Sequence, residues 1–261
     1  MRASILLVLL ACLTFRASAA EPAWAENVKK IHASFKGTPG QVAQFGDSIT
    51  FTMAFFTPML YQPSNVPADL APTLKWMVEY IQKPCWRDIK GGEWGNQSGT
   101  TSDWGLGNMD GWLKKQNPEV ALIMWGTNDA KHGPVGKYKS IMAGIVDKCI
   151  ANGTIPVLYT IPPFASQGKD PNQAKLVEGY VTAVREVAAE KKVPLIDFYK
   201  AIMDRQPKDF GTTLMGDELH PSYPDGHQNN FSEDDLKLSG YSLRNYLTLV
   251  AFKDLQPYLK K

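Results

Sequence analysis

The sequence predicts an α/β fold in which a parallel sheet lies between two layers of helices. Short apolar runs of strand length alternate along the chain with longer segments of helical periodicity. Two of these runs, Glu119–Trp125 and Thr154–Thr160, are almost continuously apolar, which is typical of parallel strands buried on both faces. The alternation of strands and helices favours right-handed βαβ units, and these place helices on both sides of the sheet.

Length and composition are those of one globular domain. The 261 residues are 44% hydrophobic and 21% charged, which argues against a disordered chain or a coiled coil. The sequence has no internal repeat and no low-complexity linker, so a single domain is expected. The formal charge of +2 falls to zero without Arg2 and Arg16, and no run of Lys or Arg marks a face for nucleic acid.

The first 20 residues have the layout of a secretory signal peptide. Arg2 precedes the apolar run Ile5–Leu13, and small residues follow at Ala17–Ala20. The run is too short to span a bilayer, and no later segment resembles a transmembrane helix. We therefore expect a signal peptide at residues 1–20, a domain at residues 21–261, and a location in a periplasm or outside the cell.

The three cysteines leave two alternatives open. Leu9-Leu10-Ala11-Cys12 also resembles a lipoprotein site, which would anchor the chain through Cys12, although the apolar core would then be very short. Without the signal, Cys85 and Cys149 remain, and an oxidising compartment permits either a disulfide or two separate thiols. Neither has a Cys or His neighbour at metal-ligand spacing, so no metal site is expected.

The stretch Gln41–Thr50 predicts a strand, a tight turn and a helix. The helical pattern of Glu21–Lys36 ends in a Gly- and Pro-rich break, and the apolar residues of the next strand stop at Gly46-Asp47-Ser48. A turn of this kind presents one side chain at the carboxyl end of a strand. Ser48 is therefore a candidate nucleophile, provided that a base reaches it.

The segment Phe51–Lys90 is rich in aromatic residues and prolines. Leu70–Gln82 has helical periodicity, and the rest is expected to be ordered loop. The aromatic side chains either line a binding cleft or pack a small core beneath the loop. The patterns predict further strands within Trp86–Trp94 and at Glu119–Trp125, Thr154–Thr160 and Val193–Phe198, and further helices at Asn108–Gln116, Lys137–Asn152, Asn172–Lys191 and Leu236–Leu255.

Polar clusters follow the predicted strands at their carboxyl ends, where open parallel sheets bind ligands. Ser48 follows the first strand, Ser98-Gly99 the second and Asn128 the third. Asp217–Pro221 follows the last strand after a loop. We expect these clusters to meet at one edge of the sheet.

The clustered residues supply complementary chemical groups. Asp217 lies three residues before His220 and can orient its imidazole, and His220 can then take the proton of Ser48. Attack on an ester carbonyl leaves an oxyanion. The backbone N–H groups of Ser48 and Gly99 and the side-chain amide of Asn128 are candidate donors to it. The set predicts a serine esterase.

The four clusters together resemble the SGNH hydrolase family, also called GDSL esterases and lipases. Gly46–Thr50 matches the first block of the family, and Asn96–Thr101 resembles the second around Gly99. Gly126–Asp129 matches the third block and Asp217–Pro221 the last. The blocks stand in the order of the family, and the ordered set is more specific than any one of them.

The resemblance implies a three-layer α/β/α fold of the flavodoxin-like type with five parallel strands. It implies Ser48 as nucleophile, His220 as base and Asp217 as the acid that orients it. The N–H of Ser48, Gly99 and Asn128 would form the oxyanion hole. Neither a cofactor nor a metal would be needed.

Two features depart from the family pattern. A shift of one residue in the second block would place Ser98 rather than Gly99 at the donor position, and backbone donation survives either choice. The segment Ser222–Asp235 is an extra loop before the closing helix. Its Asp225 and His227 either reach the substrate or belong to a solvated surface loop, and two ligands are too few for a metal site.

We expect a secreted serine ester hydrolase that removes short acyl groups, such as acetyl, from carbohydrate. Seven tryptophans and the lack of a long apolar lid favour sugar over lipid. A lipase or lysophospholipase of the same family is one alternative, and a catalytically silent glycan-binding module is another. The sequence points to a small-molecule or polysaccharide ester as substrate and leaves the oligomeric state open.

Overall fold

The computed structural model describes residues 21–259, so the predicted signal peptide and the Cys12 alternative lie outside the described residues. The strands are β1 (Val42–Gly46), β2 (Val120–Met124), β3 (Ile155–Tyr159) and β4 (Leu195–Ile196). The α-helices are α1 (Ala25–Ser34), α2 (Ser48–Phe51), α3 (Ala71–Tyr80), α4 (Pro84–Arg87), α5 (Ser102–Gln116), α6 (Asp129–His132), α7 (Val135–Ala151), α8 (Pro171–Lys191), α9 (Phe198–Arg205), α10 (Glu233–Leu238) and α11 (Gly240–Leu259). Short 3-10 helices are η1 (Thr57–Tyr61), η2 (Gly92–Trp94), η3 (Ala165–Gly168) and η4 (Phe210–Thr213).

The strands form a parallel sheet in the order β1-β2-β3-β4. Phe45 of β1 pairs with Ile123 of β2, and Leu122 of β2 pairs with Val157 of β3. Every residue of β1, β2 and β3 is buried, because helices cover both faces of the sheet. The two continuous apolar runs therefore predicted β2 and β3 correctly, and the strand expected at the start of Gln41–Thr50 is β1.

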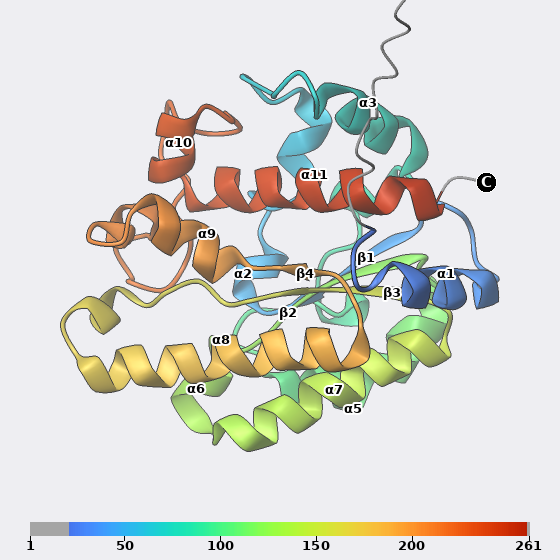
Figure 1. Ribbon diagram of the computed structural model, residues 1–261, viewed down its shortest axis with the longest axis horizontal. Coiled ribbons are helices and arrows are strands. Elements are labelled where there is room, and N and C mark those ends of the chain that lie inside the picture. The colour runs from blue at the N-terminus through green and yellow to red at the C-terminus, as the bar shows by residue number, and fades with distance from the viewer. Residues whose placement is uncertain (1–20, 260–261) are drawn as a thin grey trace, which may run out of the picture.

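Three layers are visible in Figure 1, with the sheet in the middle. Helices α5, α7 and α8 pack on one face, and α1 and α11 pack on the other, with α3 against α11. The predicted α/β/α class is confirmed. Because all strands are parallel, their carboxyl ends meet at one edge, and the loops that follow β1, β2 and β3 begin there.

The strand expected within Trp86–Trp94 is wrong, and so is the fifth strand of the sheet. The segment folds as α4 and η2, and one parallel bridge between Gly46 and Asn96 marks the place of an added strand beside β1. Gly91 and Gly95 have φ angles of 109° and 91°. These left-handed conformations interrupt an extended strand, and they let the chain turn beside β1.

Four elements differ from the prediction. Helix α5 begins at Ser102 rather than Asn108, and β4 contains only two residues. Helix α9 was not predicted. The closing helix is divided into α10 and α11, which meet at Ser239. The Ser239 side chain accepts the N–H of Ser242 and opens α11.

The aromatic residues of Phe51–Lys90 mainly pack a small core, which was one of the two alternatives. Phe55, Phe56 and Trp86 are fully buried. The rings of Phe56 and Trp86 are stacked with centroids 4.6 Å apart, and the Phe55 ring meets Tyr159 edge-on at 6.0 Å. This loop core is continuous with the main core through β3.

Cys85 and Cys149 are free thiols, and both are buried. Burial raises the pKa of the Cys85 thiol to about 11 and that of Cys149 to about 12. Cys85 Sγ accepts the backbone N–H of Val42 at 3.3 Å. Of the two alternatives from the sequence, the described structure has the separate thiols.

Candidate active site

Ser48 begins helix α2 directly after β1, as the sequence predicted. Asp47 is the N-cap of this helix, and its Oδ1 accepts the N–H of Ile49 at 3.0 Å. Gly46 ends the strand, where a Cβ atom would lie 2.5 Å from the carbonyl oxygen of Met124. A side chain at this position would clash with β2. Glycine therefore allows β1 to stay paired with β2 up to the turn before Ser48.

The structure brings Ser48, His220 and Asp217 together. The Ser48 hydroxyl lies 2.7 Å from His220 Nε2, although the two residues are 172 positions apart. The Asp217 carboxylate contacts His220 Nδ1. In the neutral imidazole, Nδ1–H donates to Asp217 and Nε2 is free to accept the serine proton. The contacts meet the geometric requirement for a serine nucleophile and its base.

Backbone hydrogen bonds hold the loop that carries Asp217 and His220. Asp217 Oδ1 accepts the N–H groups of Leu219 at 3.1 Å and His220 at 3.0 Å. Burial raises the pKa of the Asp217 carboxyl, but these two amides and the His220 imidazole outweigh it and hold the pKa below its ordinary value. Asp217 is therefore an anion under neutral conditions.

The loop of the second block lies beside the turn at Ser48. The N–H of Gln97 donates to the Gly46 carbonyl at 3.1 Å, and Gly99 is exposed with a φ angle of 77°. Asn128, half-buried after β2, donates Nδ2–H to the Thr100 carbonyl at 3.0 Å. This bond uses one of the two amide hydrogens of Asn128 and leaves the other free for an oxyanion.

Residues 45–228 match the sequence profile of the GDSL-like Lipase/Acylhydrolase family, which is more than half of the chain. The chain belongs to this family. Family membership makes the protein a hydrolase of the esterase and lipase class, and the matched range contains all four blocks described above. None of the curated proteins compared with this hydrolase matches it significantly.

Several solved structures resemble this GDSL-like hydrolase. A lipase/acylhydrolase from Enterococcus faecalis is 21% identical with a TM-score of 0.57, and the match covers 84% of this chain and 96% of that one. The esterase EstA from Pseudoalteromonas sp. is 17% identical with a TM-score of 0.54 and coverages of 84% and 99%. The acetylxylan esterase Axe2 from Geobacillus stearothermophilus is 15% identical with a TM-score of 0.55 and coverages of 84% and 96%. At these identities the similarity shows the fold.

Asp129 of the GDSL-like hydrolase is a site residue that the sequence reasoning did not single out. Its carboxylate accepts the N–H of Ser102 at 3.0 Å and also contacts the Ser102 hydroxyl. Ser102 begins α5, so this contact ties the loop after β2 to the loop of the second block. The signal was available, since Asp129 directly follows Asn128 in the third block.

Asp47 is a buried carboxyl group next to Ser48 in the chain. One oxygen caps α2, and the other is buried without a hydrogen-bond partner among the described residues. Burial raises the pKa of Asp47 to about 6, although the Ile49 amide and the Arg244 guanidinium act in the opposite direction. The folded chain therefore holds a proton on Asp47 at pH values at which the unfolded chain has lost it.

We expect Asp47→Asn to stabilise the folded protein above pH 6. The folded pKa lies about two units above the usual value, so ionisation of wild-type Asp47 lowers the free energy of unfolding by roughly 3 kcal/mol as the pH rises from 4 to 7. Asparagine keeps the cap and has no charge. Thermal unfolding at several pH values should give a higher Tm for the variant at pH 8 and nearly equal values at pH 4.

The matched control for this prediction is Asp170→Asn. Asp170 caps α8 through the same type of contact, 2.9 Å to the N–H of Asn172, in a more accessible position. Its replacement should not raise Tm at pH 8. A Tm difference for Asp47→Asn that does not change between pH 4 and pH 8 would contradict the prediction.

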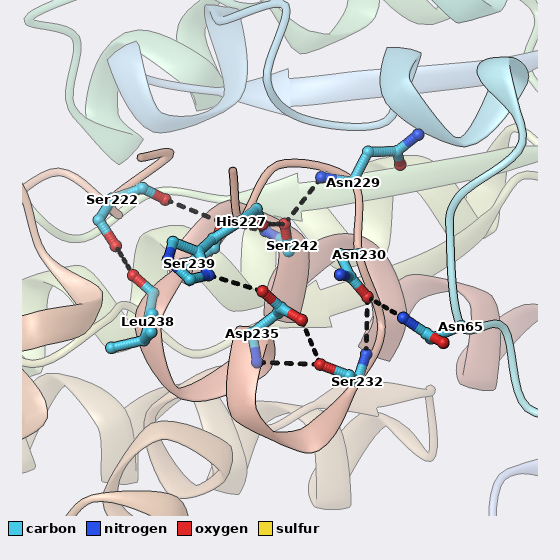
Figure 2. Close-up of polar contacts among 10 residues, drawn as sticks. All are labelled: Asn65, Ser222, His227, Asn229, Asn230, Ser232, Asp235, Leu238, Ser239 and Ser242. Carbon is cyan, nitrogen blue, oxygen red and sulfur yellow. Dashed lines mark hydrogen bonds and ion pairs between the residues drawn. The ribbon is translucent and has the colours of Figure 1, made fainter. Parts of the chain in front are cut away.

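The extra loop Ser222–Asp235 is held by its own polar contacts, which Figure 2 shows. His227 Nδ1 lies 2.6 Å from Asp235 Oδ1, and the Ser242 hydroxyl donates to the His227 carbonyl at 3.0 Å. Asp225 is exposed. His227 thus has its partner at the start of α10, in agreement with the surface-loop alternative.

The extra loop also binds the insertion that follows α2. Ser64 donates its N–H to the Asn229 carbonyl at 2.9 Å and accepts the N–H of Phe231 at 2.9 Å. Asn65 Nδ2 donates to Asn230 Oδ1 at 2.8 Å (Figure 2). The extra loop and the segment that follows α2 are therefore one connected structure.

Three exposed large apolar side chains belong to the backbone segments that carry or contact the catalytic candidates. Phe51 ends α2 three residues after Ser48 and is 42% exposed, and Met53 is 44% exposed. Met215, 51% exposed, donates its N–H to the His220 carbonyl at 2.7 Å. We call Phe51, Met53 and Met215 the apolar rim.

The tryptophans do not form the exposed stacking surface that the composition suggested. Trp86, Trp112 and Trp125 are buried and the other four are half-buried. The rings of Trp104 and Trp112 lie 4.7 Å apart, and Trp125 Nε1 donates to Thr100 Oγ1 at 3.2 Å. Trp104, Trp112 and Trp125 thus pack together, and Trp125 contacts the second-block loop at Thr100.

Among the described residues there is neither a candidate metal cluster nor a helix that could cross a membrane. Between residues 21 and 259, no group of three or more His, Cys, Asp or Glu side chains is placed to hold a metal ion. Within the same range, no helix combines the length and the apolar character that crossing a membrane requires.

Proposed function

We propose that this GDSL-like hydrolase is a serine carboxylic-ester hydrolase with Ser48 as nucleophile, His220 as base and Asp217 as orienting acid. The observation that carries the proposal is the 2.7 Å contact between Ser48 Oγ and His220 Nε2. The hydroxyl becomes nucleophilic when His220 takes its proton, and the anionic Asp217 stabilises the imidazolium that forms.

The reaction proceeds in two halves. Ser48 Oγ bonds to the ester carbonyl carbon, and the carbonyl electron pair moves to oxygen. The N–H groups of Ser48 and Gly99 and the free amide hydrogen of Asn128 receive this oxyanion. The alcohol then leaves with the proton from His220, and an acyl-enzyme remains. Water, deprotonated by His220, releases the acid and restores Ser48.

We propose short acyl esters of carbohydrate, acetyl esters in particular, as the substrates of an exported protein. The triad is accessible, because the side chain of His220 is 32% exposed and that of Asp217 is 48% exposed. An open site accepts an acyl group that is attached to a large polymer. Export would bring the protein to such polymers, in line with the signal peptide expected at residues 1–20.

A lipase or lysophospholipase is the second candidate, and the apolar rim favours it. Phe51, Met53 and Met215 expose apolar surface on the segments that carry Ser48 or pair with the backbone of His220. Burial of such surface against an acyl chain contributes roughly 25 cal/mol per Å². The rim therefore offers a binding surface for esters with longer chains.

A substrate panel separates these candidates. We expect purified protein to hydrolyse p-nitrophenyl acetate and acetylated xylo-oligosaccharides with a higher kcat/KM than p-nitrophenyl laurate or a lysophospholipid, with Ser48→Ala as the inactive control. Preference for the long-chain esters would support the lipase. Absence of all turnover, with no labelling of Ser48 by a fluorophosphonate, would favour a silent glycan-binding module.

A further inference from the structure

Two basic side chains donate hydrogen bonds to the short helix that carries Ser48. Helix α2 is a single turn, and a helix of this length is not stable by itself. Arg244 of α11 donates from Nη1 to the Ile49 carbonyl at 2.7 Å and from Nη2 to Thr50 Oγ1 at 3.2 Å. Lys90 Nζ donates to the Thr50 carbonyl at 3.0 Å.

Arg244 is fully buried, and no ion pair within 4.0 Å among residues 21–259 includes it, although the Asp47 carboxyl is near enough to raise its pKa. Its guanidinium carbon lies 3.5 Å from the centre of the Phe55 ring and 4.8 Å from that of Tyr159. Burial lowers the pKa of Arg244 to about 10, so the group is still charged at neutral pH. Burial of a charge costs folding free energy, and the hydrogen bonds to α2, the two aromatic rings and the nearby Asp47 carboxyl offset part of that cost.

Lys90 connects the same helix to the first strand. Besides Thr50, its Nζ donates to Gln44 Oε1 of β1 at 2.8 Å. Desolvation, with a smaller effect of the nearby Arg244, lowers the pKa of Lys90 to about 7. The carbonyl side of α2 is thus fixed from β1 by Lys90 and from α11 by Arg244.

We propose that Arg244 and Lys90 are positioning residues of the esterase. Their hydrogen bonds fix the direction of α2 and thereby the distance between the Ser48 hydroxyl and His220. This inference rests on the proposed function. A displacement of about 1 Å at a reacting group costs about 10²-fold in rate, so loss of these donors is expected to lower kcat and leave KM unchanged.

The test compares Arg244→Met, Arg244→Lys and Lys90→Met with wild type in p-nitrophenyl acetate hydrolysis and in the rate of Ser48 labelling by a fluorophosphonate. We expect Arg244→Met to lose about 10²-fold in kcat and in labelling rate, at unchanged KM. Lys90→Met should lose about tenfold. Arg244→Lys keeps a donor for the Ile49 carbonyl and should recover part of the loss.

Leu255→Ala is the matched control, because Leu255 is buried on α11 about three turns beyond Arg244. It should lower Tm and keep kcat at temperatures at which it is folded.

Two outcomes would overturn the proposal. One is a folded Arg244→Met protein with wild-type kcat. The other is a loss of kcat in Leu255→Ala equal to that in Arg244→Met, when the two variants have the same Tm. If Arg244→Met does not fold, wild-type kcat in both Lys90→Met and Arg244→Lys overturns it. Wild-type protein that neither hydrolyses the ester nor takes the label would overturn the proposed function itself.

Discussion

Replacement of Ser48 by alanine is expected to lower kcat about 10⁶-fold, because the acyl-enzyme can no longer form. His220 and Asp217 would stay in place, held by the backbone bonds of their own loop. Hydrolysis of p-nitrophenyl acetate by purified variant and wild type gives the ratio, and mass spectrometry after fluorophosphonate treatment shows whether the variant still takes the label. Circular dichroism should be identical for the two proteins.

The matched control is Ser140→Ala on α7. Ser140 is exposed, and its hydroxyl donates only to the Gly136 carbonyl of its own helix, at 3.1 Å. This variant should keep wild-type kcat and labelling. A Ser48→Ala protein that retains a tenth of wild-type turnover would assign the nucleophile to another residue.

Asn128→Ala is expected to lower kcat by about 10²–10³-fold. Loss of one oxyanion-hole donor typically raises the barrier by about 2.7–4 kcal/mol, and Asn128 is the only side-chain donor in the proposed hole. KM should change little, because the donor acts mainly on the charge that develops in the transition state. Steady-state kinetics with p-nitrophenyl acetate, together with thermal unfolding, checks both expectations.

Asn128 also donates to the Thr100 carbonyl, so a control must separate this bond from the catalytic effect. In Asn108 the side-chain amide donates to the Trp104 carbonyl at 2.9 Å on the exposed side of α5. Asn108→Ala loses a comparable bond and should keep kcat. Full activity in Asn128→Ala would remove its amide from the oxyanion hole.

The sequence predicted correctly those strands and helices whose residue pattern is compatible with only one kind of structure. A run such as Glu119–Trp125 is stable only when both of its faces are covered, so it indicated a central parallel strand. Ser48, Asn128 and His220 could be proposed as site residues because each stands in a short block that follows a predicted strand. Their convergence followed from one rule, that parallel strands end at the same edge of a sheet.

The remaining differences arise where tertiary contacts outweigh the local pattern. The apolar residues around Trp86 suggested a strand, but the conformations of Gly91 and Gly95 are not those of extended backbone. Arg244 was not singled out, although a signal existed, since it lies on the buried stripe of α11 with Thr248 and Leu255. Lys90 had no comparable signal, because nothing in its neighbourhood in the sequence indicates the contact with α2.

The contact between Ser64 and the Asn229–Phe231 segment has a consequence for protein engineering. Each segment completes the backbone hydrogen bonds of the other. A chimera that transfers only one of them to a relative therefore leaves backbone N–H and C=O groups without partners where the segments met. The two segments are therefore a single exchangeable part in spite of their distance in the chain. Shortening or grafting them succeeds only when both are moved at once.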